Sequence, residues 1–264
     1  MRPETVAPDR WAPVSSAPLP ELAVVITVLN EERNILPVCR ELAQILPSLP
    51  PVEVIIVDDG STDATMARLL EARQAFLPRL RLFAHPRRLG KSAALRTAIT
   101  HARAPWIATM DGDGQDDPAT FTAMLHHARN RARKGERPLI VGVRHKRRDS
   151  FSRRLATRLA NGLRRRLLKD GCPDTGAPLK LFPRQLFLAL PQFEGLHRFL
   201  PALMTSYGAQ LHCLETRHRP RLHGQSKYTN LNRALVGIAD LLGVLWLQRR
   251  TRLPNGLPED VREI

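Results

Sequence analysis

Cysteines, aromatic residues and long apolar runs are all scarce in this chain of 264 residues. The three cysteines, Cys39, Cys172 and Cys213, are far apart and show no metal-ligand spacing, so we expect reduced thiols of a cytosolic protein. The longest nearly apolar run, residues 234–247, contains Asp240 and is shorter than the roughly 20 residues that cross a bilayer. Residues 1–20 are rich in proline and lack an apolar core, which predicts a flexible N-terminal tail and no secretory signal.

Acidic residues are also in short supply. Lys and Arg number 41 against 25 Asp and Glu, so the formal net charge is +16. Such a surplus predicts an anionic partner: a phosphorylated substrate, an acidic lipid or nucleic acid. Nucleic-acid binding is the non-enzyme alternative, but only eight Phe, three Trp and two Tyr are available as stacking platforms for bases.

Short apolar runs alternate with helical periodicity through the first half of the chain. The runs predict buried strands at residues 22–28, 52–57, 80–84, 106–110 and 139–143. Helical spacing predicts helices at residues 33–46, 62–76, 91–103 and 118–134, with Ser61 or Thr62 as the cap of the second. This alternation predicts an α/β fold, in which a mostly parallel sheet is flanked by helices.

Two acidic turns follow two of the predicted strands. Asp111-Gly-Asp-Gly-Gln115 places two carboxylates and an amide at alternate positions, and Asp58-Asp59-Gly60 ends an earlier apolar run. Oxygen ligands of this kind suit Mg²⁺ or Mn²⁺, whose coordination is completed by substrate phosphates. Either turn alone is explained equally well by ordinary loop chemistry. Because the carboxyl ends of parallel strands meet at one edge, the pair predicts a site for phosphate chemistry.

Two other motifs are incomplete. A calcium loop starting at Asp111 needs Glu at its twelfth position, where this chain has Thr122. A phosphate-binding P-loop ending in Gly90-Lys91-Ser92 needs Gly at position 85, where this chain has His85. The first comparison excludes a helix–loop–helix calcium site, and the second removes the main support for nucleoside-triphosphate hydrolysis.

Two amphipathic segments with basic edges follow in the second half. Residues 144–169 contain eleven Lys and Arg against one acid, and a Phe or Leu recurs every four residues from Phe151. Residues 231–252 predict a second helix of this kind, which ends in Gln248-Arg-Arg250. Either helix can pack its apolar stripe on the domain, but the two together favour attachment to an anionic membrane surface.

Seven motifs occur in a fixed order along residues 22–247. They are Val24-Val-Ile-Thr-Val-Leu-Asn-Glu-Glu-Arg-Asn-Ile35, Val57-Asp-Asp-Gly-Ser-Thr-Asp63, Gly90-Lys-Ser-Ala-Ala-Leu95, Met110-Asp-Gly-Asp-Gly-Gln-Asp-Asp-Pro118, Asp174-Thr-Gly-Ala-Pro-Leu-Lys-Leu-Phe182, Gly195-Leu-His-Arg-Phe199 and His218-Arg-Pro-Arg-Leu-His-Gly-Gln-Ser-Lys-Tyr228. As an ordered set they resemble the family-two inverting glycosyltransferases, and most of all the dolichol- or polyprenyl-phosphate glycosyltransferase branch.

This resemblance implies a GT-A type nucleotide-sugar-binding domain at residues 21–228, followed by an amphipathic helix and tail at residues 229–264. It also implies a nucleotide-diphosphate sugar donor and Mg²⁺ or Mn²⁺. Glu31 and Asp59 would contact base or ribose, Lys91 and Asp111 the nucleotide sugar, and Asp113 with Gln115 the metal. The family usually has Pro and an aromatic residue before the Asn-Glu pair; this chain has Thr27 and Leu29, so the preferred nucleotide stays open.

The implied reaction transfers the sugar, with inversion, to a polyprenyl (dolichyl or undecaprenyl) phosphate at the cytosolic face of the membrane. A phosphate monoester has its second pKa at about 6, so this nucleophile needs positive charge more than a strong base. Arg144, Arg219, Arg221 and Lys227 are the candidates to hold it. Asp111 and Asp113 are catalytic candidates, and Asp174 is a candidate base or sugar ligand, with a structural turn as its equal alternative. Transfer to another lipid or to a saccharide stays open.

Overall fold

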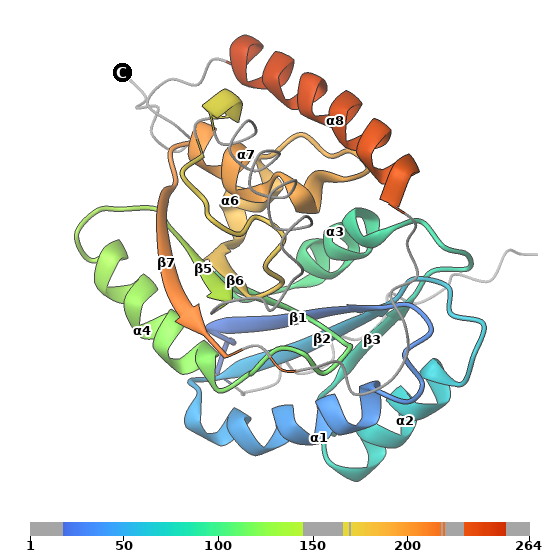
Figure 1. Ribbon diagram of the computed structural model, residues 1–264. Helices are drawn as coiled ribbons and strands as arrows, with labels where there is room; N and C mark the ends of the chain where they lie inside the picture. Colours follow the sequence, from blue (N-terminus) through green and yellow to red (C-terminus); the bar gives the residue numbers. More distant parts are fainter. Residues whose placement is uncertain (1–17, 145–165, 169, 218, 220–229, 252–264) are drawn as a thin grey trace, which may run out of the picture.

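A computed structural model describes residues 18–144, 166–168, 170–217, 219 and 230–251 of the chain. Within them, one seven-stranded sheet with strand order β3-β2-β1-β4-β6-β5-β7 is flanked by helices on both faces (Figure 1). The strands are β1 (Leu22–Val28), β2 (Val52–Asp58), β3 (Arg81–Ala84), β4 (Trp106–Asp111), β5 (Pro138–Arg144), β6 (Lys180–Pro183) and β7 (Gln210–Thr216). The helices are α1 (Ile35–Ile45), α2 (Thr65–Ala75), α3 (Lys91–His101), α4 (Thr120–Ala132), α6 (Arg184–Leu188), α7 (Leu200–Ser206) and α8 (Asn230–Arg250), with single 3₁₀ turns η1 (Leu46–Ser48) and η2 (Leu196–Arg198).

The α/β fold predicted from the sequence is confirmed, and the five predicted strands and four predicted helices of the first half are all present. The cap predicted at Ser61 or Thr62 is wrong, because α2 begins only at Thr65. The Ser61 hydroxyl instead bonds Asp58, and the Thr62 amide donates to Asn30. Four elements of the second half were not predicted: β6, α6, α7 and β7.

Strand direction places the ends of most strands at one edge. β1, β2, β3 and β4 are parallel to one another, and β5 is parallel to β7. β6 runs antiparallel to both of its neighbours, β4 and β5. The carboxyl ends of the parallel strands and the amino end of β6 therefore lie along the same edge of the sheet, where ligands of open α/β sheets bind.

Two apolar layers cover the two faces of the sheet. Residues of β1 alternate between them: Ala23 and Val25 pack with α3, α6, α7 and Val244 of α8, whereas Val24 and Ile26 pack with α1, α2 and α4. Strands buried on both faces read as continuous apolar runs, and for this reason β1, β2 and β4 were recognisable in the sequence.

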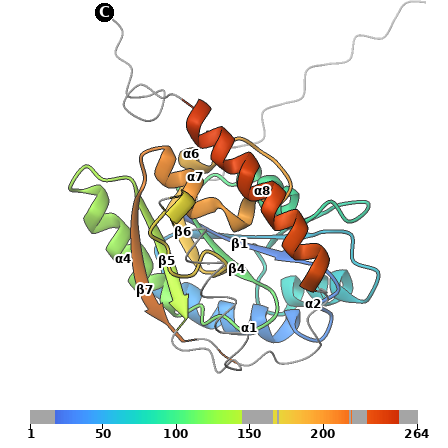
Figure 2. The same ribbon diagram turned by 45° about the horizontal axis from the view of Figure 1, so that its top comes forward.

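The helix predicted at residues 231–252 is present as α8, which packs against α7 (Figure 2). Its Val244 is fully buried in the apolar layer formed with α3, α6 and α7, while Leu242 and Trp246 on the same helix are 61% and 60% exposed. The basic helix predicted from Phe151 to Lys169 lies outside the described residues, except that residues 166–168 are helical. None of the helices in the described part of the chain is both long and apolar enough to cross a membrane.

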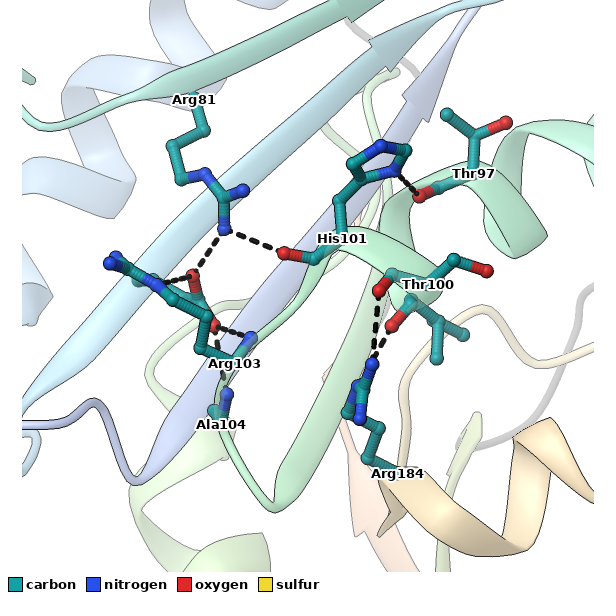
Figure 3. Close-up of polar contacts among 9 residues, drawn as sticks. Arg81, Thr97, Thr100, His101, Arg103, Ala104 and Arg184 are labelled. Atoms are coloured by element: carbon teal, nitrogen blue, oxygen red, sulfur yellow. Dashed lines mark hydrogen bonds and ion pairs between the residues drawn. The ribbon is translucent and has the colours of Figure 1, made fainter. Parts of the chain in front are cut away.

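Glu53 closes the opposite, amino-terminal edge of the sheet. Its side chain is almost fully buried and accepts hydrogen bonds from the backbone amides of Arg103 and Ala104, at 2.5 and 2.9 Å, and from the Arg81 guanidinium at 2.7 Å (Figure 3). Beside it, Arg184 donates to the carbonyl oxygens of Ile99 and Thr100 at the end of α3. The loop between α3 and β4 is therefore held by the buried carboxylate of Glu53.

We predict that Glu53→Ala lowers the free energy of unfolding by about 3 kcal/mol, because it leaves two backbone amides without an acceptor and removes the ion pairs with Arg81 and Arg103. Urea unfolding of the purified protein measures this loss. The matched control is Glu71→Ala, which removes an exposed i,i+3 pair with Arg68 and should cost at most about 0.5 kcal/mol. Equal stabilities of the two variants would contradict the role given to Glu53.

Candidate active site at the carboxyl edge of the sheet

The turns after β1 and β2 are joined by side-chain hydrogen bonds. The Asn30 amide donates to the Ser61 hydroxyl, and the Thr62 amide donates to Asn30 Oδ1, both at 2.8 Å. Asn30 adopts a φ of 52°, a backbone conformation that asparagine tolerates better than most residues. The next amide, of Glu31, donates to Thr65 Oγ1 at 2.8 Å, and Asn34 Nδ2 donates to Glu31 Oε2 at 2.6 Å. Glu31 is therefore held beside the end of β2.

Asp59 ties the end of β2 to the turn before α3. Its buried carboxylate accepts hydrogen bonds from the backbone amides of Leu89 and Gly90, at 2.9 and 2.8 Å, and lies 2.8 Å from His85 Nδ1. The other ring nitrogen of His85 contacts Thr97 Oγ1 of α3 at 2.9 Å. Both carboxylate oxygens of Asp59 thus have partners within the protein, and they fix where α3 begins.

A pocket of about 520 Å³ opens at the ends of β2 and β3. Asp58, Ser61, Thr62, His85 and Arg88 are among the residues that line it. Gly60 lies in its wall with a φ of 76°, and a Cβ there would come within 2.5 Å of the Arg87 carbonyl carbon. Only glycine fits this turn, so the close approach of the two loops depends on it.

Lys91, the first residue of α3, forms an ion pair with Asp111 at the end of β4. Their side chains are 34% and 32% exposed, so both reach the open edge. Burial alone would raise the pKa of Asp111, but the Lys91 ammonium, helped by Lys180 and His197, holds that pKa below its usual range. Asp111 is therefore ionised and already paired with one cation.

The metal ligands predicted from the sequence lie together in the next turn. The Gln115 amide donates to Asp113 Oδ1 at 3.1 Å, and the Gln115 side chain donates to the Arg219 carbonyl oxygen at 3.3 Å. The Arg219 amide donates back to the Gln115 carbonyl oxygen at 3.0 Å. The segment after β7 thereby holds the turn that carries Asp113 and Gln115.

This turn fits a hard divalent cation. Asp113 and Gln115 offer oxygen ligands, and in the described residues no group of three or more His, Cys, Asp or Glu side chains forms a complete metal cage. That donor set suits Mg²⁺ or Mn²⁺, which are held by one or two protein oxygens and by substrate phosphates. Burial and the negative charges of Asp111 and Asp113 raise the pKa of neighbouring Asp116 to about 7. A cation at this turn would offset the excess negative charge.

Of the four residues expected to bind the acceptor phosphate, the structure describes Arg144 and Arg219. Arg144 ends β5 at the same edge, where its backbone is opposite Thr216. The Arg219 guanidinium is already paired with Glu41 at 2.7 Å and with Asp117 at 3.4 Å. Arg221 and Lys227 lie outside the described residues.

Two residues of the site were quoted in motifs but given no role from the sequence. His197 of η2 lies with Nδ1 2.9 Å from the Ser92 hydroxyl, and its amide also donates to that oxygen at 3.3 Å. Burial and the nearby cations Lys91, Arg198 and Lys180 lower the pKa of His197 to about 3, so the ring is neutral. The signal for it was the histidine within Gly195-Leu-His-Arg-Phe199.

Lys180, the first residue of β6, is the second such residue. It is only 4% exposed, and its ammonium donates to the Ala177 carbonyl oxygen. Burial and the repulsion from Lys91 lower its pKa to about 8, against the attraction of Cys172, Asp111 and Asp174. The electrostatic influence of Asp174 on Lys180 places that predicted residue near the same site. The signal for Lys180 was a lysine between apolar residues in Pro178-Leu-Lys-Leu-Phe182.

Comparisons with known proteins identify the family of the chain. Residues 23–190 match the family model described as glycosyl transferase family 2. The chain is 34% identical over 259 residues to the dodecaprenyl-phosphate galacturonate synthase of Rhizobium johnstonii, covering 95% of this chain and 74% of that protein. It is 28% identical over 209 residues to the undecaprenyl-phosphate 4-deoxy-4-formamido-L-arabinose transferase of Edwardsiella ictaluri, covering 78% of this chain and 62% of that protein.

Solved structures share the fold. The glucosyl-3-phosphoglycerate synthase of Mycobacterium tuberculosis, solved with Mn²⁺, UDP and phosphoglyceric acid, superposes with a TM-score of 0.65 at 19% identity over 89% of this chain and 80% of that one. The same enzyme solved with Mn²⁺, UDP-glucose and phosphoglyceric acid gives 0.61 over 87% of this chain and 79% of that one, also at 19% identity. The GT-A type architecture expected from the sequence is confirmed.

A mostly parallel sheet with an acidic turn at its carboxyl edge defines the class of α/β proteins whose ligands bind at that edge. The chain belongs to glycosyl transferase family 2 and is a glycosyltransferase.

The depressed pKa of His197 predicts that the protein loses stability in acid. Between pH 6.5 and about 3 the unfolded chain binds a proton that folded His197 does not, so unfolding becomes easier as the pH falls. This histidine alone should contribute a slope approaching about 1 kcal/mol per pH unit near pH 5. Urea unfolding at several pH values should show a shallower slope for His197→Gln than for the wild type; identical slopes would contradict the prediction.

Proposed function

We propose that this enzyme transfers a sugar from a nucleotide-diphosphate sugar to a polyprenyl phosphate, with inversion, at the membrane surface. The observation that carries the proposal is the Asp111–Gln115 turn. It presents the carboxylate of Asp111, paired with Lys91, and the two oxygen ligands of Asp113 and Gln115, and the buried Lys180 lies close to it. Both curated relatives are named for polyprenyl-phosphate products or acceptors, and the relative at 34% identity matches nearly the whole chain. The galacturonate named in that relative makes a uronic sugar one candidate for transfer.

On the donor side, Glu31 contacts base or ribose in the crevice beside the ends of β1 and β2. Asp59 borders the same crevice and holds the Gly90 turn through its two bonded oxygens. Lys91 and Asp111 contact the diphosphate and the sugar. Asp113 and Gln115 would hold Mg²⁺ or Mn²⁺, which would supply positive charge to the diphosphate.

On the acceptor side, a lipid phosphate attacks the anomeric carbon from the face opposite the departing diphosphate, and the configuration inverts. Because that phosphate is anionic near neutral pH, the protein has to place it more than to deprotonate it. Arg144 lies at the carboxyl edge of the sheet, and Arg221 and Lys227 follow in the segment after Arg219. Arg219 itself positions Gln115, and Asp174 is a candidate sugar ligand or base near Lys180.

We further propose that the enzyme sits peripherally on the cytosolic leaflet. α8 turns Val244 into the core, leaves Leu242 and Trp246 exposed, and carries Arg249 and Arg250 in its last turn. An apolar stripe edged by arginine suits insertion at the boundary of lipid headgroups and acyl chains.

The metal assignment predicts the behaviour of two Asp113 variants. Asp113→Ala should abolish transfer, and Asp113→Asn should fold normally but lose most of the Mn²⁺-dependent binding of donor. Release of nucleoside diphosphate from UDP- and GDP-sugars with undecaprenyl phosphate measures the first, and calorimetric titration of donor with and without Mn²⁺ measures the second. Unchanged turnover in excess EDTA would exclude the metal, and recovery on adding Mn²⁺ back is the control.

The membrane assignment predicts that co-sedimentation with vesicles depends on anionic lipid and decreases with salt. Each basic residue at the surface contributes about 1 kcal/mol, and salt screens this attraction. The binding that persists at high salt should decrease in Trp246→Glu. The matched control, Leu70→Glu, changes an exposed residue of α2 on the opposite face of the sheet and should leave binding unchanged. A wild-type protein that stays in the supernatant at low salt would contradict peripheral attachment.

A further inference from the structure

The strand register places Lys180 on the same face of the sheet as Asp111 of the candidate active site. It is opposite Thr109 in the antiparallel β4–β6 pair, and Asp111 follows two residues later on β4. Side chains two residues apart on a strand point to the same face, so Lys180, Thr109 and Asp111 share the face covered by α3. The Lys180 ammonium reaches Ala177, which precedes β6 at the carboxyl edge of the sheet.

Among the described residues no carboxylate lies within ion-pair distance of the Lys180 ammonium, although Asp111 and Asp174 attract it from further away; the one bond found for the ammonium is to the carbonyl oxygen of Ala177. Asp111, the carboxylate nearest in the strand register, is already paired with Lys91. His197, which borders the same group of residues, is neutral. A buried ammonium without a carboxylate partner is costly for a folded protein, so its presence at a site suggests a ligand that supplies the negative charge.

A nucleotide-sugar donor can carry negative charge on its diphosphate and on its sugar, and the position of Lys180 favours contact with the sugar. The metal-ligand turn lies toward α1 and α4, because its Gln115 is held by Arg219, which pairs with Glu41 of α1 and with Asp117. Lys180 lies on the other face, together with Lys91 at the start of α3 and His197 of η2. A cation at that turn would compensate the diphosphate, and Lys91 is already paired with Asp111, so Lys180 is available for a negative group of the sugar itself.

We propose that Lys180 binds a carboxylate on the transferred sugar, so that the donor is a nucleoside-diphosphate hexuronate. The inference rests on the proposed function, because it assumes a nucleotide-sugar donor in this crevice. A lysine–carboxylate contact is a charge-assisted hydrogen bond, and the buried position of Lys180 strengthens it. A neutral hexose leaves the ammonium uncompensated, and a sugar carrying an amino group is repelled. Lys180 is thus a specificity-determining residue for the donor.

Donor binding without acceptor tests this proposal. UDP-galacturonate, UDP-glucuronate, UDP-galactose, UDP-glucose and UDP alone are titrated calorimetrically into the protein in Mn²⁺. The wild type should bind at least one uronate about 30-fold or more tightly than the hexose of the same configuration. Lys180→Met should remove this preference while leaving the affinity for UDP within about twofold of wild type. The methyl ester of the preferred uronate, which lacks the charge, should bind to the wild type like the neutral hexose.

Two variants serve as controls. Lys134→Met changes an exposed lysine just after α4 and should retain the wild-type preference. Lys180→Arg keeps the charge and should retain part of the preference, which an exclusively structural role for the side chain does not predict. Thermal unfolding shows whether each variant is folded, and Lys180→Arg keeps the test decisive if Lys180→Met is not.

Three results would overturn the proposal. The first is a wild type that binds hexoses as tightly as uronates. The second is a Lys180→Met variant that loses affinity for UDP and for all four sugars alike, because Lys180 would then be a phosphate ligand. The third is a Lys180→Met variant that binds donors like the wild type in the titration but shows a raised KM for undecaprenyl phosphate in the transfer assay. That result would assign Lys180 to the acceptor site. Since the titration contains no lipid, transfer to an acceptor other than polyprenyl phosphate would contradict the proposed function and leave the donor preference intact.

Discussion

The buried carboxylate of Asp59 is the constraint on which the rest of the site depends. It bonds two consecutive backbone amides, of Leu89 and Gly90, and so fixes the first turn of α3 against the end of β2. The next two residues both contact the site. Lys91 forms an ion pair with Asp111, and the Ser92 hydroxyl bonds the ring of His197, which lies more than a hundred positions later in the chain. One carboxylate, bonded on both oxygens, therefore sets the distance between three loops. A side chain so fully bonded to its own protein is better suited to positioning than to chemistry.

The two edges of the sheet show opposite treatments of charge. At the amino edge, Glu53 is matched by Arg81 and by two backbone amides, and Arg184 is matched by the last carbonyl oxygens of α3. At the carboxyl edge the matching is incomplete: Asp116 has its pKa raised to about 7, and Lys180 has its pKa lowered to about 8. Excess negative charge lies toward the metal-ligand turn and excess positive charge lies beneath α3. Neighbouring groups whose environments push their pKa values in opposite directions are typical of sites that await a charged ligand.

The sequence predicted the elements that are buried on both faces and missed those that are not. β1, β2 and β4 are continuous apolar runs, and the helices between them have clear periodicity. β7 has mostly exposed or half-buried residues, and β6 has four residues, so neither presents a pattern before the sheet is assembled. The same limit applied to the site. Asp111, Asp113 and Gln115 stand close together in the chain, whereas Lys180 and His197 reach Asp111 only through the antiparallel entry of β6 and the position of η2.

The antiparallel entry of β6 links the fold to its specificity. If this strand ran parallel to its neighbours, its last residue and the start of the following helix would lie at the carboxyl edge of the sheet. β6 instead brings its first residue there, on a rigid strand paired on both sides, with Leu179 and Leu181 buried next to it. A lysine held in that way cannot retreat to solvent, as a lysine on a loop would, and its desolvation cost is present before any donor binds. The donor that offsets this cost gains affinity over one that does not, and a buried cation of this kind therefore discriminates between sugars that differ only in charge.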